Sequence, residues 1–405
     1  MFMEIYLRIM GKIIVFIVYI ILFSIKVNAE EFKVFYSGFS FTGNYSDKTA
    51  TIKLTDQILK KKIDGMSVID KSLLDATKKI TPKNFTIITA SMADLEKGEE
   101  ESIVMSVALD YEEYNFEFEP ITKTYLNYFD LYFQILFYNF KSKKLIASIP
   151  YSAEISFFSK NKLEQKEILD HLKRFYSTGL TGKNKEPLNA FTVYEKIMNN
   201  FELKNKYRNR MGVTKVIIED KAKDFIPDTY KSRNESLKIL FAQSFSTRLS
   251  LNQNVALVPY NEGESLGKTM KLVFVNTDTI FNILLPKPDF NIELTIRGFK
   301  KVKAKESDIS ALYLYGSYIN LKILQPELNK IYLDDKFKIS HQVKIPKNIK
   351  NIKDWRKFYF STTKLFEEVT EQFSLKKPEW IKASNGNMDI ISKFAEIETL
   401  LSKCR

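Results

Sequence analysis

The fold is decided by residues 129–138, FDLYFQILFY, in which every second side chain is apolar. The residues between them include Asp130, Tyr132 and Gln134. A period of two predicts a β-strand that is half-buried, with one apolar face and one more polar face. A polar turn at 139–144 leads to a returning strand at 145–157, so this part of the chain should form a long hairpin.

A helix is expected at 163–176, directly after this hairpin. One stripe of the helix is apolar, which requires that it pack against the sheet. The same succession returns in the second half, with strands at 313–323 and 331–345, a turn at 325–330, and a helix at 354–373. The apolar stripe of that last helix consists of Trp355, Phe358, Leu365, Phe366, Val369 and Phe373.

Each hairpin is preceded by a strand, a helix and a second short strand. They fall at 32–41, 47–62 and 66–69 in the first half and at 213–218, 232–251 and 255–258 in the second. Corresponding elements lie about 180 to 190 residues apart, which indicates an internal repeat. The predicted fold class is therefore α+β. It comprises two tandem modules of similar topology, each an antiparallel-rich mixed sheet with a long hairpin packed by helices.

Five segments follow from this interpretation. Residues 178–189 contain Gly179, Gly182 and Pro187 among polar residues, which is typical of a linker. The segments are a signal peptide at 1–29, a first module at 30–180, a linker with a connecting helix at 181–212, a second module at 213–375, and a C-terminal tail at 376–405 with a possible short helix at 388–401.

The first 29 residues have the composition of a signal peptide. Arg8 and Lys12 precede an apolar run at 13–25, and Ala29 before Glu30 suits cleavage by a signal peptidase. Retention of this segment as a membrane anchor is the alternative. No second apolar run approaches membrane length, so we expect an exported protein, periplasmic or secreted, with no integral membrane span after cleavage.

The charge of the chain favours anionic partners, because most of the net charge of +13 lies outside the signal peptide. An anionic lipid or glycan is therefore a candidate ligand, although the abundance of lysine equally fits a compositional bias. Residues 94–119 are the exception, with ten carboxylates against Lys97. We interpret them as the solvated tip of a charged hairpin, with a calcium site as the alternative.

Few residues suit catalysis or metal binding. The only histidines are His171, which should lie on a helix surface, and His341, which should be a hydrogen-bonded core residue. The only cysteine is Cys404, so an internal disulfide is impossible. Phosphate-binding loops, dinucleotide-binding turns and zinc-binding helices are missing from the sequence. The sequence thus predicts no catalytic, cofactor-binding or metal-binding residues, and no cofactor.

One motif supports a different hypothesis. Residues 263–267, GESLG, match the G-x-S-x-G turn that presents a nucleophilic serine in α/β-hydrolases, which makes Ser265 a candidate nucleophile. The motif runs into a stretch rich in β-branched residues, where a hydrolase needs a helix, and His341 lies in the middle of a predicted strand. A serine hydrolase is therefore the alternative function. Its acid and base would be Asp278, Asp289, Asp308 or Asp334, followed by His341.

The order of elements resembles that of two exported modules, the N-terminal module of TolB translocation proteins and the periplasmic core of curli secretion lipoproteins. In this resemblance residues 32–36, FKVFY, begin the sheet and residues 128–148 form the hairpin. The chain lacks the lipid-bearing cysteine of the curli proteins and the propeller repeats of TolB. The resemblance therefore implies an assembly or scaffolding role in the cell envelope and transfers no site residues.

We therefore expect an exported, non-catalytic envelope protein that acts as a structural or interaction module in cell-envelope assembly or secretion. Its expected partner is another envelope protein. Nucleic acid is not expected, because the mixed basic and aromatic residues at 355–359 lie on a helix whose apolar stripe already explains the aromatic side chains.

Overall fold

The computed structural model describes most of the chain. The predicted signal peptide at 1–29 and the GESLG motif at 263–267 lie outside the described residues. Within the described part, no helix combines the length and apolar character needed to cross a membrane. The described residues are 32–42, 53–59, 62–63, 65–89, 102–119, 122–181, 187–204, 207, 209–231, 234–260, 269–274, 279–347, 354–387 and 389–405.

The first sheet is built around three long antiparallel strands. Strand β1 is parallel to both β4 and β5, while β5, β6 and β7 form an antiparallel meander. Their bounds are β1 (Phe32–Phe41), β4 (Phe85–Ile88), β5 (Ile103–Glu119), β6 (Thr124–Asn139) and β7 (Leu145–Ser159).

The second sheet repeats this arrangement in the order β11-β10-β14-β15-β16. Strand β10 is parallel to β11 and β14, and β14, β15 and β16 are antiparallel. The predicted α+β fold with two modules of similar topology is therefore confirmed. The bounds are β10 (Met211–Ile218), β11 (Leu257–Val258), β14 (Phe290–Glu306), β15 (Ser310–Gln325) and β16 (Lys330–Pro346).

Each module has helices that pack against one face of its own sheet. In the first module these are α3 (Lys53–Leu59), α4 (Val68–Thr77), α6 (Gln165–Tyr176) and α7 (Thr192–Asn200). The second module contributes α8 (Asp220–Lys223), α9 (Asp228–Lys231), α10 (Asn234–Gln253), α11 (Trp355–Gln372), α12 (Pro378–Asn385) and α13 (Ile390–Cys404). The short elements are β2 (Lys62–Ile63), β3 (Met66–Ser67), β8 (Leu180–Thr181), β9 (Pro187–Leu188) and the 3-10 turn η2 (Pro326–Leu328).

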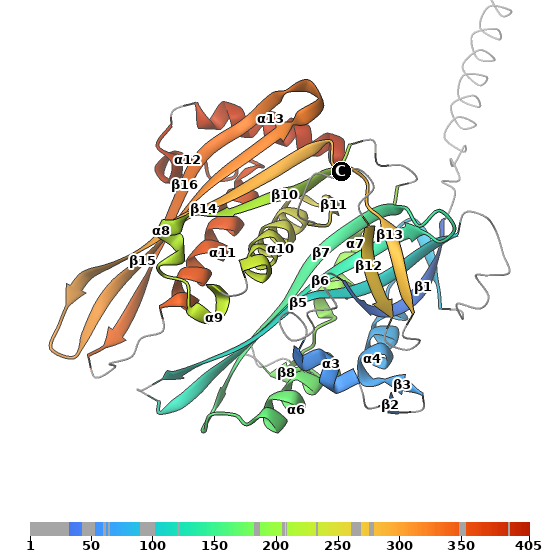
Figure 1. Cartoon of the computed structure of the whole chain (residues 1–405), viewed down its shortest axis with the longest axis horizontal. Coiled ribbons are helices and arrows are strands. Elements are labelled where there is room, and N and C mark those ends of the chain that lie inside the picture. Colours follow the sequence, from blue (N-terminus) through green and yellow to red (C-terminus); the bar gives the residue numbers. More distant parts are fainter. Residues whose placement is uncertain are drawn as a thin grey trace, which may run out of the picture.

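Each closing helix shares a core with the hairpin of its own module. Phe129 and Phe175 belong to one cluster of buried residues, while Ile319 and Leu365 belong to another. Figure 1 shows the resulting layers: the second sheet, then α10 and α11, then the first sheet, then α3, α4 and α6. Helices α10 and α11 of the second module thus lie between the two sheets.

One hairpin crosses from the second half of the chain into the first sheet. Strands β12 (Thr269–Phe274) and β13 (Ile280–Leu284) follow β11 in sequence, yet β12 pairs with the end of β1. The Leu284 amide also donates to the Lys143 carbonyl at 2.7 Å, beside the β6–β7 turn. The hairpin covers a small core that includes Leu136, Tyr138, Leu272 and Ile283. Residues 213–375 therefore contain an element that completes the first sheet.

The predicted strand at 66–69 is wrong beyond its first two residues, because α4 begins at Val68. Ser67 caps this helix: its hydroxyl accepts a hydrogen bond from the Asp70 amide at 3.1 Å and donates to the Asp70 carboxylate at 2.5 Å. A side chain that satisfies an amide at a helix start outweighs the strand preference of Val68 and Ile69. The helix predicted at 47–62 is described only as α3.

The domain limits remain a prediction that limited proteolysis can test. A protease should cut first within residues 178–189, because glycine- and proline-containing connections are preferred cleavage sites. The two fragments should elute together in gel filtration and separate only in denaturant, since the β12–β13 hairpin joins them. A first cut inside either long hairpin would contradict the limits.

Candidate functional site

The more polar face of β6, opposite the face that carries Phe129 and Phe133, lies at the junction of the two modules. Asp130, Tyr132 and Gln134 are at most 3% exposed, because α10 and α11 cover this face of the sheet. The prediction of a half-buried strand is therefore wrong: both faces of β6 are buried. A packed layer of helices replaces solvent on a face that carries polar side chains, so those side chains must find partners across the junction.

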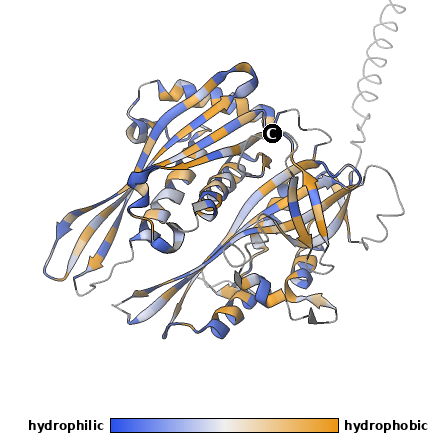
Figure 2. Ribbon diagram, viewed as in Figure 1, coloured by the Kyte–Doolittle hydropathy of each residue, from blue (hydrophilic) through white to orange (hydrophobic). Residues whose placement is uncertain are grey.

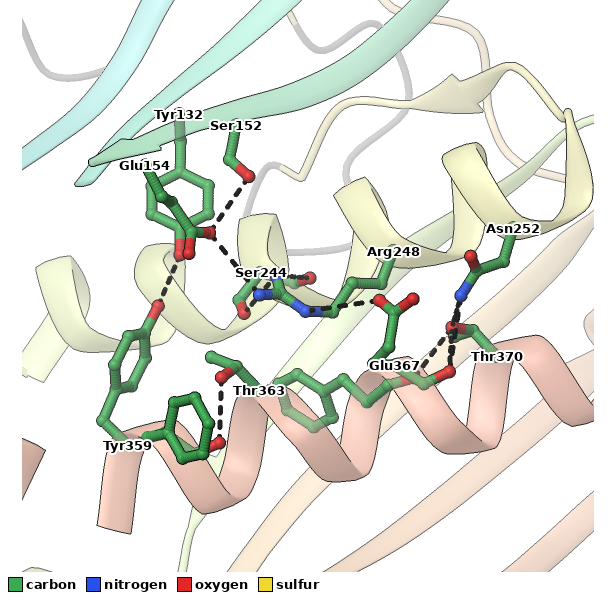
Figure 3. Close-up of polar contacts among 12 residues, drawn as sticks. Tyr132, Ser152, Glu154, Ser244, Arg248, Asn252, Tyr359, Thr363, Glu367 and Thr370 are labelled. Atoms are coloured by element: carbon green, nitrogen blue, oxygen red, sulfur yellow. Dashed lines mark hydrogen bonds and ion pairs between the residues drawn. The ribbon is translucent and has the colours of Figure 1, made fainter. Parts of the chain in front are cut away.

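Tyrosine and arginine side chains form the centre of this junction (Figure 3). The hydroxyl groups of Tyr132 on β6 and Tyr359 on α11 are 2.6 Å apart. Arg248 on α10 lies between Glu154 on β7, at 3.5 Å, and Glu367 on α11, at 3.8 Å. One guanidinium of α10 thus connects the first sheet to α11.

A second group of contacts is made by amides. Gln134 donates to Gln243 of α10 at 2.8 Å and accepts from Ser148 of β7 at 2.6 Å. Gln243 in turn donates to Asp110 of β5. Burial raises the pKa of Asp110, and the hydrogen bonds from Thr42, Gln134 and Gln243 oppose that rise.

The third group contains a buried ion pair. The guanidinium of Arg356, near the start of α11, forms two hydrogen bonds with the Asp130 carboxylate, the longer of them 3.2 Å. It also stacks over the Tyr128 ring, 4.3 Å from the ring centre. Asp130 is only 3% exposed and the Arg356 side chain is 21% exposed, so this pair joins the modules where water screens it only weakly.

Glu113 adds a second carboxylate beside this ion pair, because it lies opposite Asp130 in the β5–β6 register. Its Oε1 atom is buried and has no hydrogen-bond partner among the described residues. Burial raises the pKa of Glu113 to about 7, and the negative charge of Asp130 adds to that rise. A single arginine therefore faces two neighbouring acids.

A cleft of about 650 Å³ opens at the end of this junction, between the end of β5 and the segments around α8, α9 and the start of α11. Its walls are aromatic, with carboxylates and one arginine among them. The aromatic lining residues are Tyr114, Phe116, Phe225, Tyr230 and Trp355, and the charged ones are Glu117, Asp224, Asp228, Asp354 and Arg356.

Several of these charges are already satisfied within the chain. Glu117 pairs with Lys357 at 3.2 Å, and Asp354 accepts from Lys301 at 2.9 Å and from Tyr315 at 2.5 Å. Phe225 is 39% exposed although it also contacts Phe358, with ring centres 5.1 Å apart. The cleft can therefore accept apolar or aromatic groups against its walls, with acidic residues nearby for a basic group.

The residues proposed for a hydrolase are not brought together in the described part of the chain. Ser265 and Asp278 lie outside it. His341 is half-buried on β16, where its Nδ1 meets the Ser361 hydroxyl. Burial, and then Lys364 and Lys357, lower the pKa of His341.

None of the described candidate acids orients this histidine. Asp289 accepts from the Arg210 amide, Asp334 accepts from Asn320, and Asp308 lies in the β14–β15 turn. The chain enters strand β12 two residues after the GESLG motif, as its β-branched residues indicate. A nucleophile elbow requires a helix at that place.

Two other sequence predictions need correction. His171, expected on the helix surface, is half-buried and stacks on Phe157 with ring centres 4.5 Å apart. The acidic residues expected at a solvated hairpin tip belong, from 103 onward, to strand β5. Among them Glu112 is buried and accepts from both the amide and the hydroxyl of Thr55, so it holds the start of α3.

The calcium alternative rests in part on residues 94–101, which lie outside the described residues. Within the described residues, no cluster of three or more histidine, cysteine or acidic side chains is placed to hold a metal ion. The carboxylates of Glu112, which is buried, and of Asp110 and Glu113, which are partly buried, are the residues that the sequence analysis missed. Their signal in the sequence was that three acids lie close together within 103–119, a stretch rich in apolar residues.

Comparison with known proteins gives only a remote likeness of fold. No family model and no curated protein matches the chain. A hypothetical protein of Chlamydia trachomatis is 11% identical, with a TM-score of 0.24, and the match covers 40% of this chain and 94% of that one. None of the three structures compared is a TolB or curli protein, and TM-scores this low carry no argument about function.

The other two similar structures come from different bacteria. A homologue of a neuraminyllactose-binding hemagglutinin from Helicobacter pylori is 11% identical, with a TM-score of 0.23, over 45% of this chain and 95% of that one. A DUF330 protein from Xanthomonas campestris is 10% identical, with a TM-score of 0.21, over 40% of this chain and 79% of that one.

The buried ion pair yields a stability prediction. Arg356→Ala should lower the free energy of unfolding by about 3–5 kcal/mol, because it leaves the Asp130 charge buried without a partner. Urea denaturation measures the loss. Lys83→Ala, which breaks an exposed pair with Glu202, should cost less than about 1 kcal/mol. The double variant Asp130→Leu with Arg356→Leu should recover much of the loss, and equal costs for the two alanine variants would contradict the assignment.

Glu113 yields a prediction of pH dependence. Its pKa is raised on folding, so its protonated form favours the native state and that contribution is lost as pH rises from about 4.5 to about 7. Glu113→Gln should therefore raise the free energy of unfolding at pH 8, on the order of 2 kcal/mol, and have a much smaller effect at pH 4. The exposed Glu202→Gln is the control. A pH-independent effect of Glu113→Gln would exclude this role.

Proposed function

We propose that the protein is an exported, non-catalytic envelope protein whose inter-module cleft accepts a segment of a partner protein. The observation that carries this proposal is the cleft itself, about 650 Å³ in volume, with five aromatic side chains in its walls. Aromatic residues are enriched where proteins bind one another, because they bury much apolar area with little loss of side-chain freedom. The carboxylates at its rim suit a segment that also carries basic side chains.

The titratable groups of the junction support a binding role over a catalytic one. Arg248, Arg356, Asp130 and Asp110 are all engaged in contacts that hold the modules together. General acid–base catalysis needs a titratable group that can reach a substrate. Glu113 has a suitable pKa, but its free oxygen is buried inside the junction.

The place of action follows from the signal peptide predicted at 1–29. Export would bring the protein to the periplasm or the exterior, where a two-module scaffold can join assembly or secretion machinery. The resemblance to the TolB and curli modules supports the same role. The proposed partner is an envelope protein, bound through an extended segment with aromatic or aliphatic and basic side chains.

Site-specific crosslinking tests the proposal. A photo-crosslinking phenylalanine analogue at Phe225, which is 39% exposed in the cleft, should capture one envelope protein in the native host. The same analogue at Ile280, which is 58% exposed on β13, should not capture it. Phe225→Asp should abolish co-purification of the captured protein while leaving the circular dichroism spectrum unchanged.

Two outcomes would overturn the proposal. Capture of the same proteins from both positions would mean that the cleft has no specific partner. Labelling of the purified protein by a fluorophosphonate probe, with loss of labelling in Ser265→Ala, would support the serine hydrolase in place of the binding protein.

A further inference from the structure

The two sheets differ in what covers them. Helices α10, α11, α12 and α13 pack on one face of the second sheet, the face that includes Ile319 and Phe337. The opposite face, called here the outer face, consists of the alternate residues of β10, β14, β15 and β16. Many of its side chains are exposed. Figure 2 shows hydrophilic and hydrophobic residues alternating along these strands.

The strand register places an excess of basic residues on the outer face. Lys336 lies opposite Asn320, Lys338 opposite Tyr318, and Lys344 opposite Leu312. The acids on this face are Glu293 and Asp334, and Glu293 pairs with Lys322 at 3.8 Å. The basic residues that the register places on this face are Lys215, Lys300, Lys305, Lys322, Lys336, Lys338 and Lys344.

Most of these charges have no counterion within the described residues. The six lysines other than Lys322 are exposed, and none of them forms an ion pair with a described side chain. Like charges on neighbouring strands, which lie about 4.8 Å apart, repel one another. The approach of an anionic surface to such a face lowers the electrostatic free energy.

The outer face also carries apolar side chains among its lysines. Ile217 is 39% exposed, Val302 is 40% exposed and Ile331 is 53% exposed. Their register partners, Thr295, Leu314 and Leu324, place all three on the outer face. A glycan would not bury the exposed aliphatic groups of this basic face. A lipid bilayer offers both anionic headgroups for the lysines and an apolar interior for the aliphatic groups.

We infer that the outer face of the second sheet docks on a lipid bilayer that contains anionic phospholipids. The lysines span four strands and so form a two-dimensional array, which matches the plane of headgroups better than a single polyanionic chain does. The lysines provide long-range attraction, and the aliphatic side chains enter the interfacial region. The cleft described above lies at the module junction, so this inference does not depend on the proposed partner.

Vesicle binding tests the inference with the chain from Glu30 onward, which retains every described element. This chain should sediment with phosphatidylcholine vesicles that contain roughly one quarter phosphatidylglycerol, and not with pure phosphatidylcholine. Binding should weaken at least about tenfold as NaCl rises from about 50 to about 300 mM. A variant with Lys300→Gln, Lys336→Gln, Lys338→Gln and Lys344→Gln should lose at least about tenfold in affinity.

A matched control removes the same charge from the first module. The variant with Lys71→Gln, Lys78→Gln, Lys166→Gln and Lys173→Gln alters four exposed lysines of α4, α6 and the turn after α4, and should bind as the parent does. Equal losses in the two variants would show attraction by net charge alone and overturn the inference. Retention on heparin without vesicle binding would overturn it in favour of a polyanionic glycan, and crosslinking from Phe225 would be unaffected in either case.

Discussion

Arg356 and Asp130 form the contact on which the arrangement of the two modules depends. Helix α11 brings the arginine to a carboxylate that becomes buried when α10 and α11 cover this face of the first sheet. A buried carboxylate without a cation would either unfold the junction or take up a proton. The tyrosine pair, Arg248 and the glutamine contacts then follow along the same face of the first sheet, each with one partner from each module.

The two modules share a topology but differ in how many faces of their sheets are covered. The first sheet is covered on both faces, by its own helices and by those of the second module, whereas the second sheet keeps an exposed outer face. The difference is visible in side-chain chemistry. Strand β6 places Tyr132 and Gln134 where partners exist, while β16 places Lys336 and Lys338 where no described element covers them.

Most of the fold could be predicted from the sequence because its elements are long and strongly periodic. The stripe of α11 and the alternation in β6 both specify a local structure without reference to distant residues. The junction could not be predicted, because Asp130 and Arg356 are 226 residues apart and neither carries a local sign of the other. The same holds for the β12–β13 hairpin, whose pairing with β1 depends on tertiary contact alone, and for the buried Glu113.

The β12–β13 hairpin makes the folding of the first sheet depend on the order in which the chain is synthesised. Ser40 and Phe41 of β1 pair with Phe274 and Val273 of β12, which lie more than half the chain away in sequence. A nascent polypeptide therefore lacks the partner for this end of β1 until β12 (Thr269–Phe274) has been synthesised, and open edges invite pairing with other chains. A companion protein that shields this edge during synthesis would keep the first module from pairing with other chains.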